Sequence, residues 1–287
     1  MVRLKFTIEL NYGIAASVCD FIFNIHAAQT RHQAVYTEQL YISQPVQPMI
    51  YVDPIGTRYT RVQALSGQLT VRYDATVDIT HHVESPANLA EVPISQLPAE
   101  ALPYIYPSRY CQSDRLGKFV AWEFGHLPPG YARVQAIQDW VRRRTSFLSG
   151  SSNSSTSAVD TIIEQAGVCR DFAHLMIALC RAMSIPARFV SGIDYGADPI
   201  LGPTDFHAYV EVFLSDRWYL FDPTGITPPM GLVRIGTGRD AADASYATVF
   251  GSVLSSAPVI SIQAIDDPDH GWTLPQHCSD ALSTHSG

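Results

Sequence analysis

Residues 167–183 read GVCRDFAHLMIALCRAM, with a cysteine at the start of a stretch that is apolar on nearly every side. The apolar residues recur at helical spacing, and a helix that is apolar almost all round is buried at the centre of a domain. Pro186 follows shortly afterwards, and proline ends a helix. We therefore expect a central helix over residues 169–183, with Cys169 at its N-terminal rim.

Cys169 has the context of a nucleophile. A thiol at a helix N-terminus feels the positive end of the helix dipole, which favours the reactive thiolate. Gly167, two residues earlier, gives the chain freedom to turn. Cys180 lies eleven residues further on (180 − 169), roughly 16 Å along the helix, so it is too far away for a disulfide and is expected to be inert packing. The other cysteines have no comparable context: Cys19, Cys111 and Cys278.

His207 is the predicted base among ten histidines. It opens the alternating run 207–214, which is typical of a strand. His174 is on the same helix as Cys169 but lies about 140° around it, so it should point elsewhere. Of the histidines in this part of the chain, His207 alone stands at the start of a strong strand.

Asp222 is the predicted orienting acceptor. It directly follows the strand-like run 218–221, which a short turn joins to the strand of His207. Antiparallel neighbours run in opposite directions, so the end of the second strand returns to the start of the first. Asp205, two residues before His207, is the rival acceptor. The sequence favours a site of Cys169, His207 and Asp222.

The first ~95 residues have the alternating pattern of short strands and predict a β-sandwich-like domain. Turn residues at 11–13, 53–56 and 66–67 are expected to separate those strands. Five prolines between residues 86 and 107 mark a connector that cannot form long helices. Beyond residue 262 the chain is polar and rich in histidine, and we expect a loosely held tail.

Four segments together resemble the core of the transglutaminase-like superfamily, and most of all its bacterial cysteine-protease-like members. The family order is Cys, His, Asp, and this chain matches all three positions. The upstream β module and residues 107–114 also resemble the N-terminal region of that bacterial group. The four core segments are Gly167–Leu175, Ile185–Arg188, Asp205–Val212 and Trp218–Thr224.

The resemblance implies an α+β fold, with an N-terminal all-β domain followed by a papain-like transglutaminase core. The expected boundaries are residues 1–95 for the β domain, 96–262 for the core and 263–287 for the tail. It also implies that Cys169 is the nucleophile, His207 the base and Asp222 the orienting residue. The expected activity is thiol-dependent hydrolysis of an amide or peptide bond through a thioester. Protein-glutamine transamidation, acyl transfer from a thioester cofactor and a catalytically silent binding module on the same fold are the alternatives.

Composition excludes several other classes. The 287 residues carry a formal net charge of −8, and the longest basic run is the triplet 142–144, so we expect no nucleic-acid partner. Five cysteines, an odd number, do not suggest a disulfide framework. No metal-binding spacing, long apolar run or clear signal peptide is present. We expect a soluble, cytoplasmic hydrolase that acts on a peptide or protein, with no cofactor, no metal and no membrane contact. Its oligomeric state is open.

Overall fold

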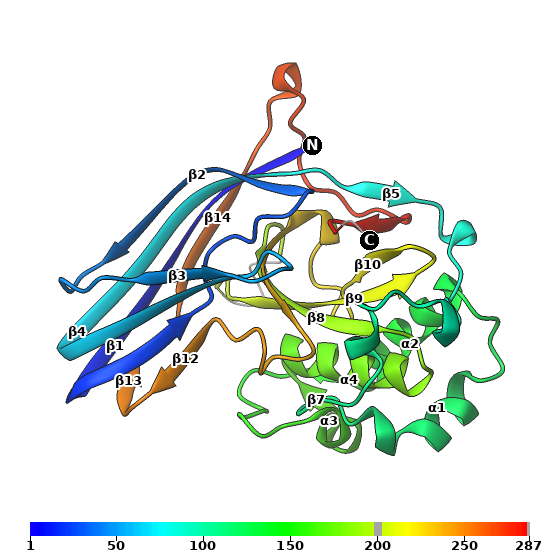
Figure 1. Cartoon of the computed structure of the whole chain (residues 1–287). Coiled ribbons are helices and arrows are strands. Elements are labelled where there is room, and N and C mark those ends of the chain that lie inside the picture. The colour runs from blue at the N-terminus through cyan, green and yellow to red at the C-terminus, as the bar shows by residue number, and fades with distance from the viewer. Residues whose placement is uncertain (198–202, 286–287) are drawn as a thin grey trace.

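The computed structural model describes residues 1–197 and 203–285 of the chain. Long N-terminal strands occupy one side of the molecule, and the helices gather on the other side of a second, smaller sheet (Figure 1). The predicted α+β class, with an all-β N-terminal part, is confirmed.

β1 (Val2–Phe23) and β4 (Arg58–Ile79) form one long antiparallel ladder. Its register shifts after Ile14, and a bulge of this kind bends the strands. The ring of Tyr12, before the bend, lies 5.1 Å from the ring of Phe21, after it. The ladder thus folds over its own apolar side chains and encloses a continuous core.

The chain returns to this first sheet after completing the second. The predicted core limits of 96–262 group these late residues with the catalytic core, because pairing between strands so far apart in sequence leaves no local signal. β2 (Gln33–Ile42) and β3 (Met49–Val52) pair with β4, and three late strands pair with β1: β12 (Ala247–Phe250), β13 (Val253–Ser255) and β14 (Val259–Ile265).

The second sheet carries the predicted central helix. Helix α4 (Cys169–Ala182) packs against β8 and β9, and every residue from Asp171 to Arg181 is buried. The predicted helix and the strand-like runs 207–214 and 218–221 are confirmed. The order in the sheet is β10-β9-β8-β11, all antiparallel, with bounds β8 (Ala187–Asp194), β9 (His207–Leu214), β10 (Arg217–Phe221) and β11 (Leu232–Gly238).

Other helices pack around α4 on its outer side (Figure 1). The proline-bearing connector forms isolated 3-10 turns, as expected for a segment that cannot sustain a helix. The helices are α1 (Gly117–Phe124), α2 (Tyr131–Arg144) and α3 (Ala158–Glu164), and the turns are η1 (Pro86–Asn88), η2 (Ile94–Gln96), η3 (Leu102–Tyr104) and η4 (Ser113–Arg115).

Two local predictions are wrong. Residues 11–13 do not turn but continue β1 opposite residues 68–70 of β4, because the ladder supplies their backbone hydrogen bonds. The tail is not loose throughout. β15 (Ala281–Ser283) pairs with β5 (His82–Glu84), and all three residues of β15 are buried. The turn expected at 53–56 does connect β3 with β4.

A buried cluster of charges lies on the face of β9 away from α4. Arg188 Nε donates to Glu211 Oε2 at 2.8 Å, and Arg234 Nη1 donates to the same oxygen at 3.1 Å. Burial raises the pKa of Glu211, but the two guanidinium groups outweigh it and lower that pKa to about 2. Arg234 also donates to Thr284 Oγ1 at 2.9 Å, so the cluster fastens the C-terminal segment to the second sheet.

Candidate active site

Cys169 is the first residue of α4, as the sequence predicts. The helix start is fixed by Asp171, whose carboxylate accepts a hydrogen bond from the N–H of Val168 at 2.9 Å. A Cβ on Gly167 would lie 2.7 Å from the Cβ of Asp171, so this position needs glycine. Cys169 is partly exposed, whereas Cys180 is buried, and burial raises the pKa of Cys180.

His207 lies beside Cys169 at the start of β9. The thiol is 3.8 Å from the carbonyl oxygen of Phe206, the residue directly before His207. His207 is only 6% exposed. Burial opposes its positive charge, yet the pKa of His207 is raised well above its ordinary value, chiefly by Asp222 and also by Cys169 and Asp194. The site therefore favours the imidazolium form.

Asp222 is on the other side of the ring. Its Oδ1 lies 3.3 Å from His207 Nε2. The same oxygen accepts hydrogen bonds from the N–H and the hydroxyl of Thr224, at 2.9 and 2.6 Å. Burial raises the pKa of Asp222, but His207 and Thr224 together lower it, so the carboxylate is held as an anion. The three residues predicted as a site are thus brought together.

Sequence reasoning missed Thr224 and Asp194. Thr224 Oγ1 lies 3.4 Å from His207 Nε2 and bridges the ring to Asp222. The sequence signal for Thr224 is its position two residues after Asp222, because an aspartate side chain often accepts a hydrogen bond from the backbone N–H two residues later. Asp194, the last residue of β8, lies 3.9 Å from His207 Nδ1. No local pattern marks Asp194, because its position depends on the register between β8 and β9.

The rival residues lie elsewhere. The carboxylate of Asp205 accepts from its neighbour's N–H at 2.7 Å and is exposed, and in residues 1–197 and 203–285 no hydrogen bond or ion pair joins it to His207. His174 stacks on Tyr110 at 4.9 Å and accepts from the N–H of Ala241. Burial lowers the pKa of His174 to about 3, so it stays neutral.

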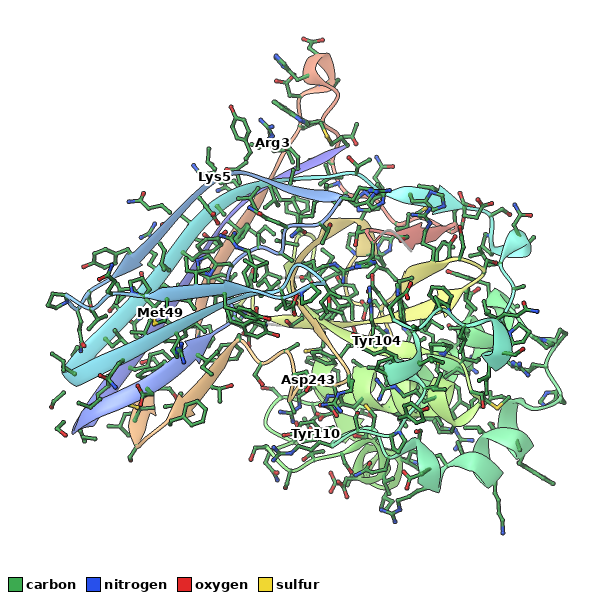
Figure 2. All side chains as sticks on the ribbon, viewed as in Figure 1. Arg3, Lys5, Met49, Tyr104, Tyr110 and Asp243 are labelled. Atoms are coloured by element: carbon green, nitrogen blue, oxygen red, sulfur yellow. The ribbon has the colours of Figure 1, made fainter. Side chains whose placement is uncertain are left out.

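Two aromatic residues that could donate to an oxyanion, Tyr110 and Trp122, gain no support from their positions. The hydroxyl of Tyr110 donates to the carbonyl of Ser154 at 2.8 Å, and Tyr110 lies on the helical side of the molecule (Figure 2). The side chain of Trp122 is 86% exposed. The N–H groups at the start of α4, which lack acceptors within the helix, remain the natural donors for an oxyanion.

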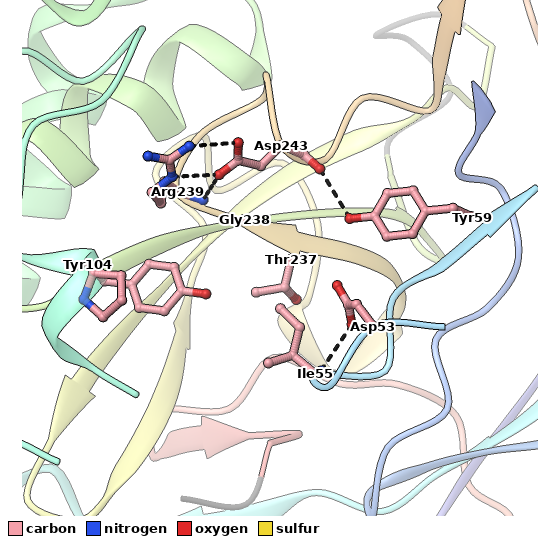
Figure 3. A pocket seen from close by; sticks show the side chains of 9 residues that line it. Asp53, Ile55, Tyr59, Tyr104, Thr237, Gly238, Arg239 and Asp243 are labelled. Carbon is pink, nitrogen blue, oxygen red and sulfur yellow. Dashed lines mark hydrogen bonds and ion pairs between the residues drawn. The ribbon is translucent and has the colours of Figure 1, made fainter. Parts of the chain in front are cut away.

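A hollow of about 380 Å³ lies at the far end of β11. Asp53, Tyr59, Tyr104 and Arg239 are among its lining residues, and the triad is not (Figure 3). β11 pairs with Asp194 at its start and reaches the hollow at its end, so six residues, roughly 20 Å of strand, separate the two places. The hollow is therefore distinct from the candidate active site.

Across 1–197 and 203–285, no three or more His, Cys, Asp or Glu side chains are grouped so as to hold a metal ion. The expectation of no metal and no cofactor stays a prediction. Within the same residues, no helix has both the length and the apolar character that crossing a bilayer requires.

Comparison with known proteins identifies relatives that share this fold. Residues 2–100 match the bacterial transglutaminase N-terminal domain, and residues 120–223 match the transglutaminase-like superfamily. The crystal structure of a proposed cysteine protease from Cytophaga hutchinsonii superposes with a TM-score of 0.90 and 39% identity, over 98% of this chain and 97% of that one.

Two curated relatives are uncharacterised mycobacterial proteins. One, from Mycobacterium leprae, is 32% identical over 115 residues, which are 38% of this chain and 41% of the relative. The other, from Mycobacterium tuberculosis, is 32% identical over 142 residues, 46% of this chain and 45% of the relative. The matched regions thus span less than half the length of these relatives.

The fold and these likenesses support a papain-like, cysteine-dependent enzyme activity in general terms. The chain belongs to the transglutaminase-like superfamily.

Proposed function

We propose that this protein hydrolyses an amide or peptide bond through a thioester on Cys169. The observation that carries the proposal is the position of one imidazole, His207, which lies 3.3 Å from the Asp222 carboxylate and directly follows Phe206, whose carbonyl oxygen is 3.8 Å from the Cys169 thiol. A nucleophile, a base within hydrogen-bond reach and a group that orients the base are the parts that covalent acyl transfer needs. The proposed substrate is a peptide or protein.

In the first half-reaction, the thiolate of Cys169 attacks the amide carbonyl and forms a tetrahedral oxyanion. N–H groups in the first turn of α4 stabilise that oxyanion. His207, charged at this stage, donates its proton to the leaving amine, and the carbon–nitrogen bond breaks to give a thioester. Asp222 accepts from Nε2 throughout and keeps the ring oriented.

In the second half-reaction, His207 takes a proton from water, and the resulting hydroxide attacks the thioester. The product is a carboxylic acid, and the Cys169–His207 pair is restored. The partial exposure of Cys169 supports water as the acceptor, because water reaches any thioester that is not sealed from solvent. A transamidase must bind the amine first or exclude water.

Peptide libraries containing glutamine, supplied with and without a primary amine, test this proposal. Acid products that form in both conditions are expected. Dominant incorporation of the amine would replace hydrolysis by transamidation, and the absence of any product with the whole library would favour a silent module. The variant Cys169→Ala should lose all products, and Cys180→Ala, which alters a buried thiol on the same helix, should retain them.

The remaining proposals concern context. A cytoplasmic location is consistent with five free cysteines, since reducing compartments keep thiols unpaired. We keep the division into a β domain and a catalytic core as a working description, with residues 247–265 transferred to the β domain on the basis of their strand pairing.

A further inference from the structure

The His207 ring lies between two buried carboxylates, of which the proposed mechanism uses one. Asp222 faces Nε2, and Oδ2 of Asp194 lies 3.9 Å from Nδ1. Asp194 is 4% exposed. The register of the second sheet produces this contact, because His207 pairs with Gly192 and Asp194 is two residues further along the same face of β8.

Asp194 is supported by two hydroxyl groups. Tyr209 donates to Asp194 Oδ2 at 3.1 Å, and Thr227 donates to the same oxygen at 3.2 Å. The two hydroxyls are 2.6 Å apart. Burial, together with Asp194 and Asp222, raises the pKa of Tyr209 well above its ordinary value, so its hydroxyl keeps its proton and remains a donor. Each hydroxyl has one proton, so while one donates to the other, the second donates to Asp194, and the pair stabilises negative charge on the oxygen that faces His207.

The charged and titratable groups around His207 come from every element packed against it. They are Cys169 on α4, Asp194 on β8, Tyr209 on β9 and Asp222 after β10. Burial and the nearby Asp222 raise the pKa of Asp194 above its ordinary value, and His207, Tyr209 and Thr227 oppose that rise only in part. A negative Asp194 and a positive His207 therefore stabilise each other, since both side chains are buried.

We propose that Asp194 is a second positioning residue for His207, which holds the ring from its Nδ1 side and stabilises the imidazolium form. This role rests on the proposed function, since it tunes the same Cys169–His207 pair. Asp222 and Thr224 both contact the ring at Nε2, whereas Asp194 lies on its Nδ1 side. Two carboxylates on opposite sides restrain it and extend to higher pH the range in which His207 can donate a proton.

The alternative is that Asp194 has a structural role only, in which its hydrogen bonds connect Thr227 to Tyr209 on β9. Loss of a purely structural residue would lower folding stability but leave the titration midpoint of His207 unchanged. The two possibilities are therefore separated by measuring the protonation of His207 itself.

NMR titration of the His207 ring tests the proposal, with the resonance assigned by its loss in His207→Gln. The titration is performed in a Cys169→Ala background, so that the thiol does not couple to the ring. Asp194→Asn keeps the side chain's shape and removes its charge. The midpoint of His207 is expected to fall by about one pH unit or more, the effect of removing an opposite charge at this range. Asp205→Asn, an exposed carboxylate two residues from His207, is the matched control and should leave the midpoint unchanged.

A second variant guards against misfolding of Asp194→Asn. Tyr209→Phe with Thr227→Val removes both donors and keeps the carboxylate, which then takes up a proton more readily. The His207 midpoint should again move to lower pH. An unchanged midpoint in whichever of these variants folds would overturn the proposal. Neither result depends on turnover, so a protein that shows the shift but hydrolyses nothing would refute the proposed function and leave the role of Asp194 intact.

Discussion

Replacement of Asp222 by asparagine removes the charge that does most to raise the pKa of His207. The two side chains have nearly the same shape, so Thr224 can still donate to the oxygen of the amide. With Asp222 Oδ1 at 3.3 Å from Nε2, loss of an opposite charge lowers a pKa by about one to three pH units. Each unit corresponds to about 1.4 kcal/mol, so the imidazolium loses about 1.4–4 kcal/mol of stabilisation.

This loss should appear as a fall of roughly 10- to 1000-fold in kcat/KM at neutral pH. The basic limb of the pH profile should also move to lower pH, because His207 gives up its proton earlier. The assay is hydrolysis of a peptide substrate across the pH range, with thermal melting to verify folding and Asp205→Asn as a control of equal charge change. A folded Asp222→Asn protein with native kcat/KM and an unmoved basic limb would refute the assignment of Asp222.

Two further predictions concern Thr224 and the buried charge cluster. Thr224→Val removes a hydroxyl that donates to the Asp222 anion at 2.6 Å, and such a bond contributes about 1.5–3 kcal/mol. We therefore expect kcat/KM to fall roughly tenfold or more. Thr224→Ser, which keeps the hydroxyl, should restore most of the lost kcat/KM. Unaltered kinetics in Thr224→Val would show that the bridge is dispensable. Glu211→Gln leaves Arg188 and Arg234 without their anion and should lower the free energy of unfolding by about 3–5 kcal/mol, measured by denaturant titration. The control is Asp74→Asn in the exposed ion pair with Arg72, which should lower the free energy of unfolding by at most about 1 kcal/mol. Because the pKa of Glu211 is lowered from 4.5 to about 2, its contribution to native stability is present above pH 4.5 and should fade as the pH falls towards 2, and Glu211→Gln should lack that part of the acid dependence.

The catalytic half of the fold could be predicted because its signals are local. The apolar stretch of α4 identifies a buried helix, and the alternation after His207 identifies a strand. The short turn between β9 and β10 then dictates that Asp222 returns to His207, since a tight hairpin permits only antiparallel pairing.

The parts that escaped prediction depend on contacts between distant residues. Gly13 resembles a turn residue, yet it pairs with Gln68 inside the long ladder, where β4 supplies its partners. Gly67, in contrast, has φ +114 at the bend of that ladder, so a turn-like residue does mark a real irregularity there. The contact of Asp194 with His207 depends on a sheet register that no single segment encodes.

The central claim is that Cys169 carries the acyl group during turnover, and mass spectrometry after rapid acid quenching tests it most directly. A peptide with an activated ester is mixed with the protein, and the acylated residue is located by peptide mapping. We expect one acyl group on Cys169, sensitive to hydroxylamine as a thioester is, absent from Cys169→Ala and present in Cys180→Ala. Turnover without acylation of Cys169, or full hydrolysis by a folded Cys169→Ala protein, would contradict the account.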